Sequence, residues 1–158
     1  MLEKIYSEVT REWDTSVEEA LKSFIRLPAL SPDFDKKWED NGVLLKALVE
    51  AQAWAEKQGI KGLRCEIIKD DGHTPCLFVE VDATSDKKFE RSVFFYGHLD
   101  KQPPNEGWDP DKSAWEPVIQ NGRLYGRGAV DDGYAFYTSL AAVKALQTLG
   151  IPHPRCVG

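Results

Sequence analysis

The spacing of the apolar residues changes near Leu63, and this change limits the fold more than any other feature of the sequence. Before it, apolar residues recur at the spacing of amphipathic helices. After it, the short β-rich segments LRCEIIK, CLFVEVD and RSVFFYG are separated by DDGHT and by the polar ATSDKKFE, which predicts strands. The third segment is nearly continuous in apolar character around Phe94, which predicts a strand that is covered on both faces.

Two helices are predicted before these strands. The first begins at Ser16, where SVEE fits a capping box, and ends before Pro28. The second begins near Pro32 and ends at Gly59. Gly42 lies inside it and costs about 1 kcal/mol relative to alanine, so an unbroken helix is less favoured there.

The carboxyl-terminal half continues with a loop, a hairpin and a helix. A loop rich in proline, aspartate and tryptophan is predicted from Lys101 to about Ser113, followed by two short strands around the turn Asn121-Gly122. DDGYAFYTSLAAVKALQTLG then predicts a helix that ends at Gly150. Helices, strands and a final helix in this order predict an α/β fold with a mixed β-sheet and flanking helices.

Charge and composition exclude several classes of protein. The 158 residues suit one domain or one lobe of a larger protein, and 20 basic against 26 acidic side chains give a net charge of -6. Basic residues do not cluster with aromatic ones, so nucleic acid is not expected as a partner. The sequence has no signal peptide and no window of about 20 apolar residues, so we expect a soluble, cytoplasmic protein with no membrane partner.

The three cysteines, Cys65, Cys76 and Cys156, are widely spaced and are predicted to be buried thiols.

The strand segment FFYG leads directly into His98, with Asp100 two residues later. Side chains two apart on an extended chain point to the same side, so both can face one cavity at the carboxyl end of a strand. A metal-bound histidine needs its second ring nitrogen held by an acceptor, and Asp100 can provide one. The pattern alone is weak, because a surface histidine followed by a turn aspartate is commoner.

A second motif, LYGRGAVDDGYA, lies about thirty residues further along. A strand passes through glycines into two aspartates at the start of the last helix, where a negative charge faces a helix amino terminus. Aspartates at this position also cap helices, so capping and metal binding remain alternatives for this motif. A phosphate loop is excluded because neither GxxxxGK[ST] nor GxGxxG is present, and a serine hydrolase because no G-x-S-x-G occurs.

Together, YGHLDKQPP, a following GW, and LYGRGAVDDG resemble the aminoacylase and carnosinase family of di-zinc exopeptidases and deacylases, which includes glutamate carboxypeptidases and succinyl-diaminopimelate desuccinylases. The resemblance spans roughly residues 63–150 and implies the first part of a phosphorylase/hydrolase-like zinc exopeptidase catalytic domain. It implies that His98 ligates a metal, that Asp100 orients the His98 ring, and that Asp131 bridges two metals and precedes a cis peptide bond. Two zinc ions, or manganese or cobalt, are the implied cofactors of the full-length enzyme. Many members have lysine and glycine soon after the aspartate pair, whereas this chain has Gly133 and Tyr134.

The resemblance also implies parts that this sequence does not contain. A pair of glutamates, one of them the general base, follows the bridging aspartate by thirty to forty residues in the family, and a lid or dimerisation domain is inserted later. We therefore expect residues 1–158 to be the amino-terminal portion of a hydrolase of dipeptides or N-acyl amino acids. We expect this portion to be inactive alone, to bind metal weakly or not at all, and to self-associate. The alternative is a non-enzymatic module that weakly binds a metal or pairs with another chain.

Overall fold

The computed structural model describes residues 1–84 and 91–158. Five α-helices lie in these ranges, and the first two are joined through a π-helical turn at Trp13–Val17. Their bounds are α1 Leu2–Glu12, α2 Glu18–Arg26, α3 Trp38–Asn41, α4 Val43–Glu56 and α5 Tyr134–Thr148. None of these helices is long and apolar enough to cross a membrane.

The main sheet is mixed, as the sequence predicts. Its strand order is β1-β2-β6-β3, with bounds β1 Leu63–Ile68, β2 Cys76–Val81, β3 Val93–Phe94 and β6 Cys156–Val157. β6 runs antiparallel to β2 and parallel to β3, so it joins two strands that are not paired with each other. A separate hairpin, β4 Val118–Gln120 and β5 Arg123–Tyr125, closes around Asn121 and Gly122, which both have positive φ angles of 52° and 72°.

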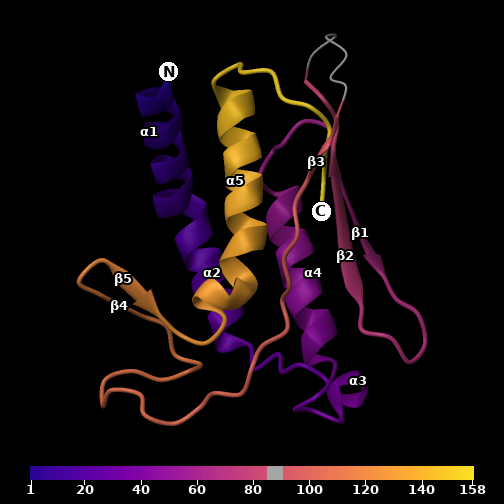
Figure 1. Ribbon diagram of the computed structural model, residues 1–158, viewed down its shortest axis with the longest axis vertical. Coiled ribbons are helices and arrows are strands. Elements are labelled where there is room, and N and C mark those ends of the chain that lie inside the picture. The colour runs from indigo at the N-terminus through magenta and orange to yellow at the C-terminus, as the bar shows by residue number, and fades with distance from the viewer. Residues whose placement is uncertain (85–90) are drawn as a thin grey trace.

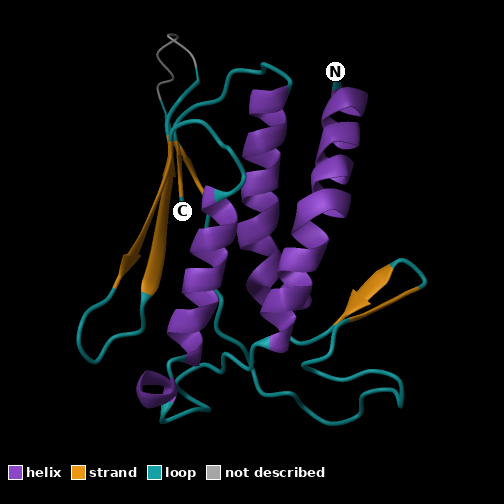
Figure 2. Cartoon of the chain, turned by 180° about the vertical axis from the view of Figure 1, so that it is seen from behind, coloured by secondary structure: helices purple, strands orange, loops and turns teal. Residues whose placement is uncertain are grey.

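The elements form layers. Figure 1 shows α4 and α5 between the sheet and α1, and the view from behind in Figure 2 shows the same order with the β4–β5 hairpin beyond the helices. One apolar cluster fills the space between the helices and another lies between α5, α4 and the sheet. The predicted α/β class with a mixed sheet and helices is therefore confirmed, with the described helices on one face of the sheet.

The first helix differs from its prediction at its amino end. It begins at Leu2 rather than Ser16, because α1 continues through the π-helical turn into α2. The predicted capping box is wrong, since Ser16 lies inside this continuous helix. Its hydroxyl instead accepts a hydrogen bond from Trp54 Nε1 at 3.0 Å and donates one to Gln58 Oε1 at 3.1 Å, which links the first helical segment to α4.

The second helix is shorter than predicted. Residues 32–34 form a turn, and α4 begins only at Val43 because Gly42 adopts a left-handed φ of +66°. Asn41 Oδ1 accepts a hydrogen bond from the Val43 backbone N–H at 2.9 Å, which satisfies one donor at the start of α4. The predicted end at Gly59 is confirmed by its φ of +67°.

The strand around Phe94 is not covered on both faces. Phe94 is 72% exposed and Val93 is 40% exposed on β3, which is one of the two edge strands of the sheet, and the described helices lie on one face of the sheet (Figures 1 and 2). Part of the polar segment predicted before it, residues 85–90, lies outside the described residues.

The prediction of three buried thiols is wrong for one cysteine. Cys156 is buried, Cys65 is partly buried, and Cys76 is exposed at the start of β2. Burial raises the pKa of Cys65 to about 11, with a further contribution from the Glu56 carboxylate. Burial also raises the pKa of Cys156. These two thiols are therefore poor nucleophiles at neutral pH.

Candidate metal centre

His98 and Asp100 lie on the segment that follows β3. The backbone N–H of Phe95 donates to the Val157 carbonyl at 2.8 Å, which keeps the start of this segment beside β6. Leu99 is buried in the core between the helices, while the side chains of His98 and Asp100 are 35% and 38% exposed. The alternation expected of an extended chain therefore places the two polar side chains together, as the sequence predicts.

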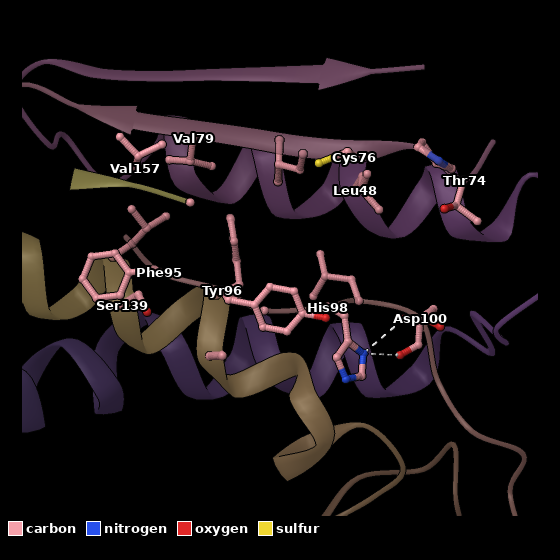
Figure 3. A pocket seen from close by; sticks show the side chains of 18 of the residues that line it. Leu48, Thr74, Cys76, Val79, Phe95, Tyr96, His98, Asp100, Ser139 and Val157 are labelled. Carbon is pink, nitrogen blue, oxygen red and sulfur yellow. Dashed lines mark hydrogen bonds and ion pairs between the residues drawn. The ribbon is translucent and has the colours of Figure 1, made fainter. Parts of the chain in front are cut away.

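The His98 ring lies between two aspartates. Its Nδ1 is 3.1 Å from Asp100 Oδ1 and 3.1 Å from the Asp100 carbonyl oxygen, and its Nε2 is 3.2 Å from Asp131 Oδ1. The contact with Asp100 is visible in Figure 3. The three predicted site residues, from two motifs about thirty residues apart, thus meet around one imidazole.

Asp131 is presented by a glycine-rich turn before α5. Gly128 has a φ of +86°, and the backbone N–H of Gly133 donates to the Gly128 carbonyl at 2.9 Å, which closes the turn. Asp131 and Asp132 have non-helical backbone angles, and the peptide bond between them is cis, as expected. Asp131 therefore lies outside α5 and is not an N-cap of that helix, whose cap residue is Gly133.

Several glycines allow this turn to approach its neighbours. A Cβ atom on Gly133 would lie 2.3 Å from Phe24 Cε1, and one on Gly128 would lie 2.7 Å from Lys101 Cε. Gly97, directly before His98, is less restricted, since its Cβ would lie 3.3 Å from Ala135 Cβ and 3.4 Å from Asp132 Oδ2. Glycine is thus required at the turn that presents Asp131, where a side chain would overlap Lys101 or Phe24.

Lys101 is a buried residue that sequence reasoning placed in a surface loop. It is 1% exposed, and burial lowers its pKa to about 7, although three backbone carbonyl oxygens around its ammonium group favour the charged form. A lysine after an aspartate is ordinarily solvent-exposed, so no sequence signal marked it.

A cavity of about 480 Å³ adjoins the site between β2, α5 and residues 95–100. Figure 3 shows side chains from β2 and α5 along it, with His98 and Asp100 at the end opposite Phe95 and Val157. Much of its lining is apolar, from side chains such as Leu77, Val79 and Leu140. His98 and Asp100 therefore lie at one end of a largely apolar cavity.

The residues present fit part of a metal site. A neutral imidazole carries one N–H, so it donates to only one of the two aspartates; the other contact is satisfied either by a second proton on the ring or by a cation between the two groups. Two ligands about 2.0–2.2 Å from a tetrahedral zinc ion lie roughly 3.4 Å apart, close to the separation of His98 Nε2 and Asp131 Oδ1. Within residues 1–84 and 91–158, no group of three or more histidine, cysteine, aspartate or glutamate side chains is arranged to hold a metal ion.

Comparisons with known proteins cover the residues of this site. Residues 94–158, which contain His98, Asp100 and Asp131, match the family model described as Peptidase family M20/M25/M40. These residues belong to that peptidase family. The resemblance inferred from the two motifs is therefore confirmed.

Individual M20/M25/M40 relatives extend the similarity over the rest of the chain. A succinyl-diaminopimelate desuccinylase of Sphingopyxis alaskensis is 32% identical over 127 residues, which are 80% of this chain and 30% of that protein. The Cys-Gly metallodipeptidase dug1 of Schizosaccharomyces pombe is 26% identical over 158 residues, covering 97% of this chain and 32% of the relative.

The fold is shared with a solved structure. Human carnosine dipeptidase 1 superimposes with a TM-score of 0.73 at 23% identity, covering 99% of this chain and 33% of the other. The chain thus spans about a third of the length of these relatives.

The close approach of the glycine turn to Lys101 gives a test of local stability. We expect Gly128→Ala to lower the free energy of unfolding by about 1–3 kcal/mol more than Gly72→Ala does. Both glycines have positive φ, +86° and +74°, but a Cβ on Gly72 would meet nothing within 4 Å. The difference in the free energy of unfolding between the two variants, measured by chemical denaturation, therefore reports the steric contact at Gly128. Equal losses of stability in the two variants would contradict this contact.

Proposed function

We propose that this chain provides part of the metal centre of a hydrolase that cleaves peptide or N-acyl-amino-acid amide bonds. The observation that carries the proposal is the contact of His98 with both Asp100 and Asp131, at 3.1 Å and 3.2 Å, from opposite sides of one ring. Membership of residues 94–158 in Peptidase family M20/M25/M40 supports the same conclusion.

Each of the three residues has a separate role in the proposed site. His98 binds a metal through Nε2, because Nδ1 faces Asp100. Asp100 accepts the Nδ1–H bond, which fixes the tautomer and orientation of the ring. Asp131, whose side chain is 59% exposed, offers a carboxylate open enough to contact two metal ions. Zinc is the proposed metal, with manganese or cobalt as alternatives, and when bound it lowers the pKa of a water and polarises the scissile carbonyl.

The proposed substrates are dipeptides or N-acyl amino acids. The names of the relatives support this class, since one is a desuccinylase and another a Cys-Gly metallodipeptidase. We propose that residues 1–158 are the amino-terminal part of the catalytic domain, and that the remaining metal ligands and the general base lie in other residues.

A non-enzymatic role for the 158-residue chain alone is the second candidate. It is favoured by the number of ligands, because two protein ligands are fewer than the three or four that zinc sites generally have. In that case the chain binds a metal weakly or pairs with another chain.

Zinc binding tests the ligand assignment. We expect calorimetric titration of the 158-residue chain to show weak zinc binding, and this binding should be lost in His98→Ala and in Asp131→Ala. His73→Ala is the matched control, because His73 lies on the exposed turn between β1 and β2, where its Nδ1 contacts the Asp71 carbonyl at 3.1 Å. A tight site for two zinc ions, or binding that His73→Ala removes instead, would contradict the assignment.

An activity assay tests the role of the chain. With zinc or manganese present, we expect no turnover of dipeptides or N-succinyl amino acids by residues 1–158, because the general base is proposed to lie in other residues. Turnover that is lost in Asp131→Ala would show that the chain is a sufficient hydrolase, and turnover that survives this change would remove the di-metal interpretation.

Self-association is expected from the exposed edge of the sheet. Phe94 in the edge strand β3 is 72% exposed and Tyr96, two residues later, is 76% exposed, and edge strands pair with other chains. Light scattering should therefore detect an oligomer at micromolar concentration, and Phe94→Lys should shift it towards monomer. Phe34→Lys is the control, since Phe34 is exposed away from the sheet. A monomeric parent chain would contradict this expectation.

A further inference from the structure

The ammonium group of Lys101 has a matched set of partners at the end of α2. Its Nζ donates to the carbonyl oxygens of Phe24 at 2.6 Å, Ile25 at 3.1 Å and Leu27 at 2.7 Å. An ammonium group has three N–H donors, one for each of these carbonyls at the end of the helix. The Phe24 and Leu27 carbonyls also accept from the backbone N–H groups of Leu27 at 3.0 Å and Ala29 at 2.9 Å, so Lys101 adds a second donor to these two and supplies a donor to the Ile25 carbonyl. A positive charge at this end also interacts favourably with the helix dipole.

The backbone of Lys101 is fixed to the segment that follows the same helix. Its N–H donates to the Ala29 carbonyl at 2.8 Å, and its carbonyl accepts from the Ser31 N–H at 2.9 Å. These bonds form a parallel bridge between Leu30 and Lys101. Because Lys101 directly follows Asp100, both its main chain and its side chain fix the position of the segment that carries His98 and Asp100.

The second motif rests on the same group of atoms. The Lys101 Nζ lies 4.0 Å from the centre of the Phe24 ring. The stem of Lys101 and this ring together occupy the space that Cβ atoms on Gly128 and Gly133 would need. The turn that presents Asp131 is therefore positioned against Lys101 and Phe24.

We propose that Lys101 is a positioning residue that holds His98 and Asp131 in register for one metal ion. This inference rests on the proposed function and adds a residue that touches neither the metal nor the substrate. A methionine at this position would fill a similar volume, but it would remove the Lys101 donor from the Ile25 carbonyl and one of the two donors from each of the Phe24 and Leu27 carbonyls. The end of α2 would then be released from both motifs.

The test compares Lys101→Met with Lys112→Met. Lys112 is the control because its ammonium group contacts Asp109 and Asp111 in the loop, remote from His98. In the parent chain, Asp131→Asn should shift the ¹⁵N signals of the His98 ring, since the two groups are 3.2 Å apart. We expect this shift to disappear in the Lys101→Met background and to persist in the Lys112→Met background, at a temperature where all variants are folded.

Zinc affinity provides a second measurement. Lys101→Met should weaken His98-dependent zinc binding by about tenfold or more, as for residues that orient metal ligands, and Lys112→Met should not. If Lys101→Met does not fold, Lys101→Gln, which is polar but uncharged and one atom shorter than lysine, should give the same loss in both measurements.

The two proposals fail in different ways. A folded Lys101→Met chain that is less stable but keeps the Asp131-dependent shift of the His98 ring would overturn the positioning role and leave Lys101 as a stabilising residue. Absence of any His98-dependent zinc binding in the parent chain would instead contradict the proposed function. The ¹⁵N spectra of the His98 ring would still decide whether Lys101 positions His98 and Asp131 relative to each other.

Discussion

The ammonium group of Lys101 and the ring of Phe24 meet at the carboxyl end of α2, and both halves of the candidate metal centre rest against them. The segment with His98 and Asp100 reaches this point from the outermost strand of the sheet, and the turn with Asp131 reaches it from the start of α5. Neither segment belongs to a helix or strand itself, so their relative positions depend on this shared support. Glycines at 126, 128 and 133 permit the contact, since Cβ atoms there would overlap Ile25, Lys101 or Phe24.

The charge arrangement around His98 explains why such support is needed. Two carboxylates face the two nitrogens of one ring, and a neutral imidazole can donate to only one of them. The second contact is satisfied by a second ring proton or by a cation between Nε2 and Asp131, and the proposed function assigns a metal ion to this position. A metal ion there would bind two ligands that the fold already holds about as far apart as ligands of one zinc ion are. The open side of the site, where Asp131 is 59% exposed, leaves space for further ligands.

Much of this arrangement is predictable from the sequence because it depends on local patterns. The β-rich segments, the hairpin at Asn121-Gly122 and the pairing of His98 with Asp100 follow from spacing and turn chemistry. The resemblance to a family added the role of Asp131 and the cis peptide bond. The start of the first helix was not predictable, because Ser16 bonds to Trp54 in α4 and to Gln58 just after it, 38 and 42 positions away. Lys101 was missed for a similar reason, since its burial depends on α2 and on the glycine turn and not on its neighbours in the sequence.

The central claim is that one metal ion binds between His98 and Asp131. Anomalous diffraction at the zinc absorption edge, from crystals of this chain soaked in zinc, tests it most directly. The account predicts a peak about 2.0–2.2 Å from both His98 Nε2 and Asp131 Oδ1. Peaks at other residues only, with the His98 and Asp131 contact unchanged, would contradict it.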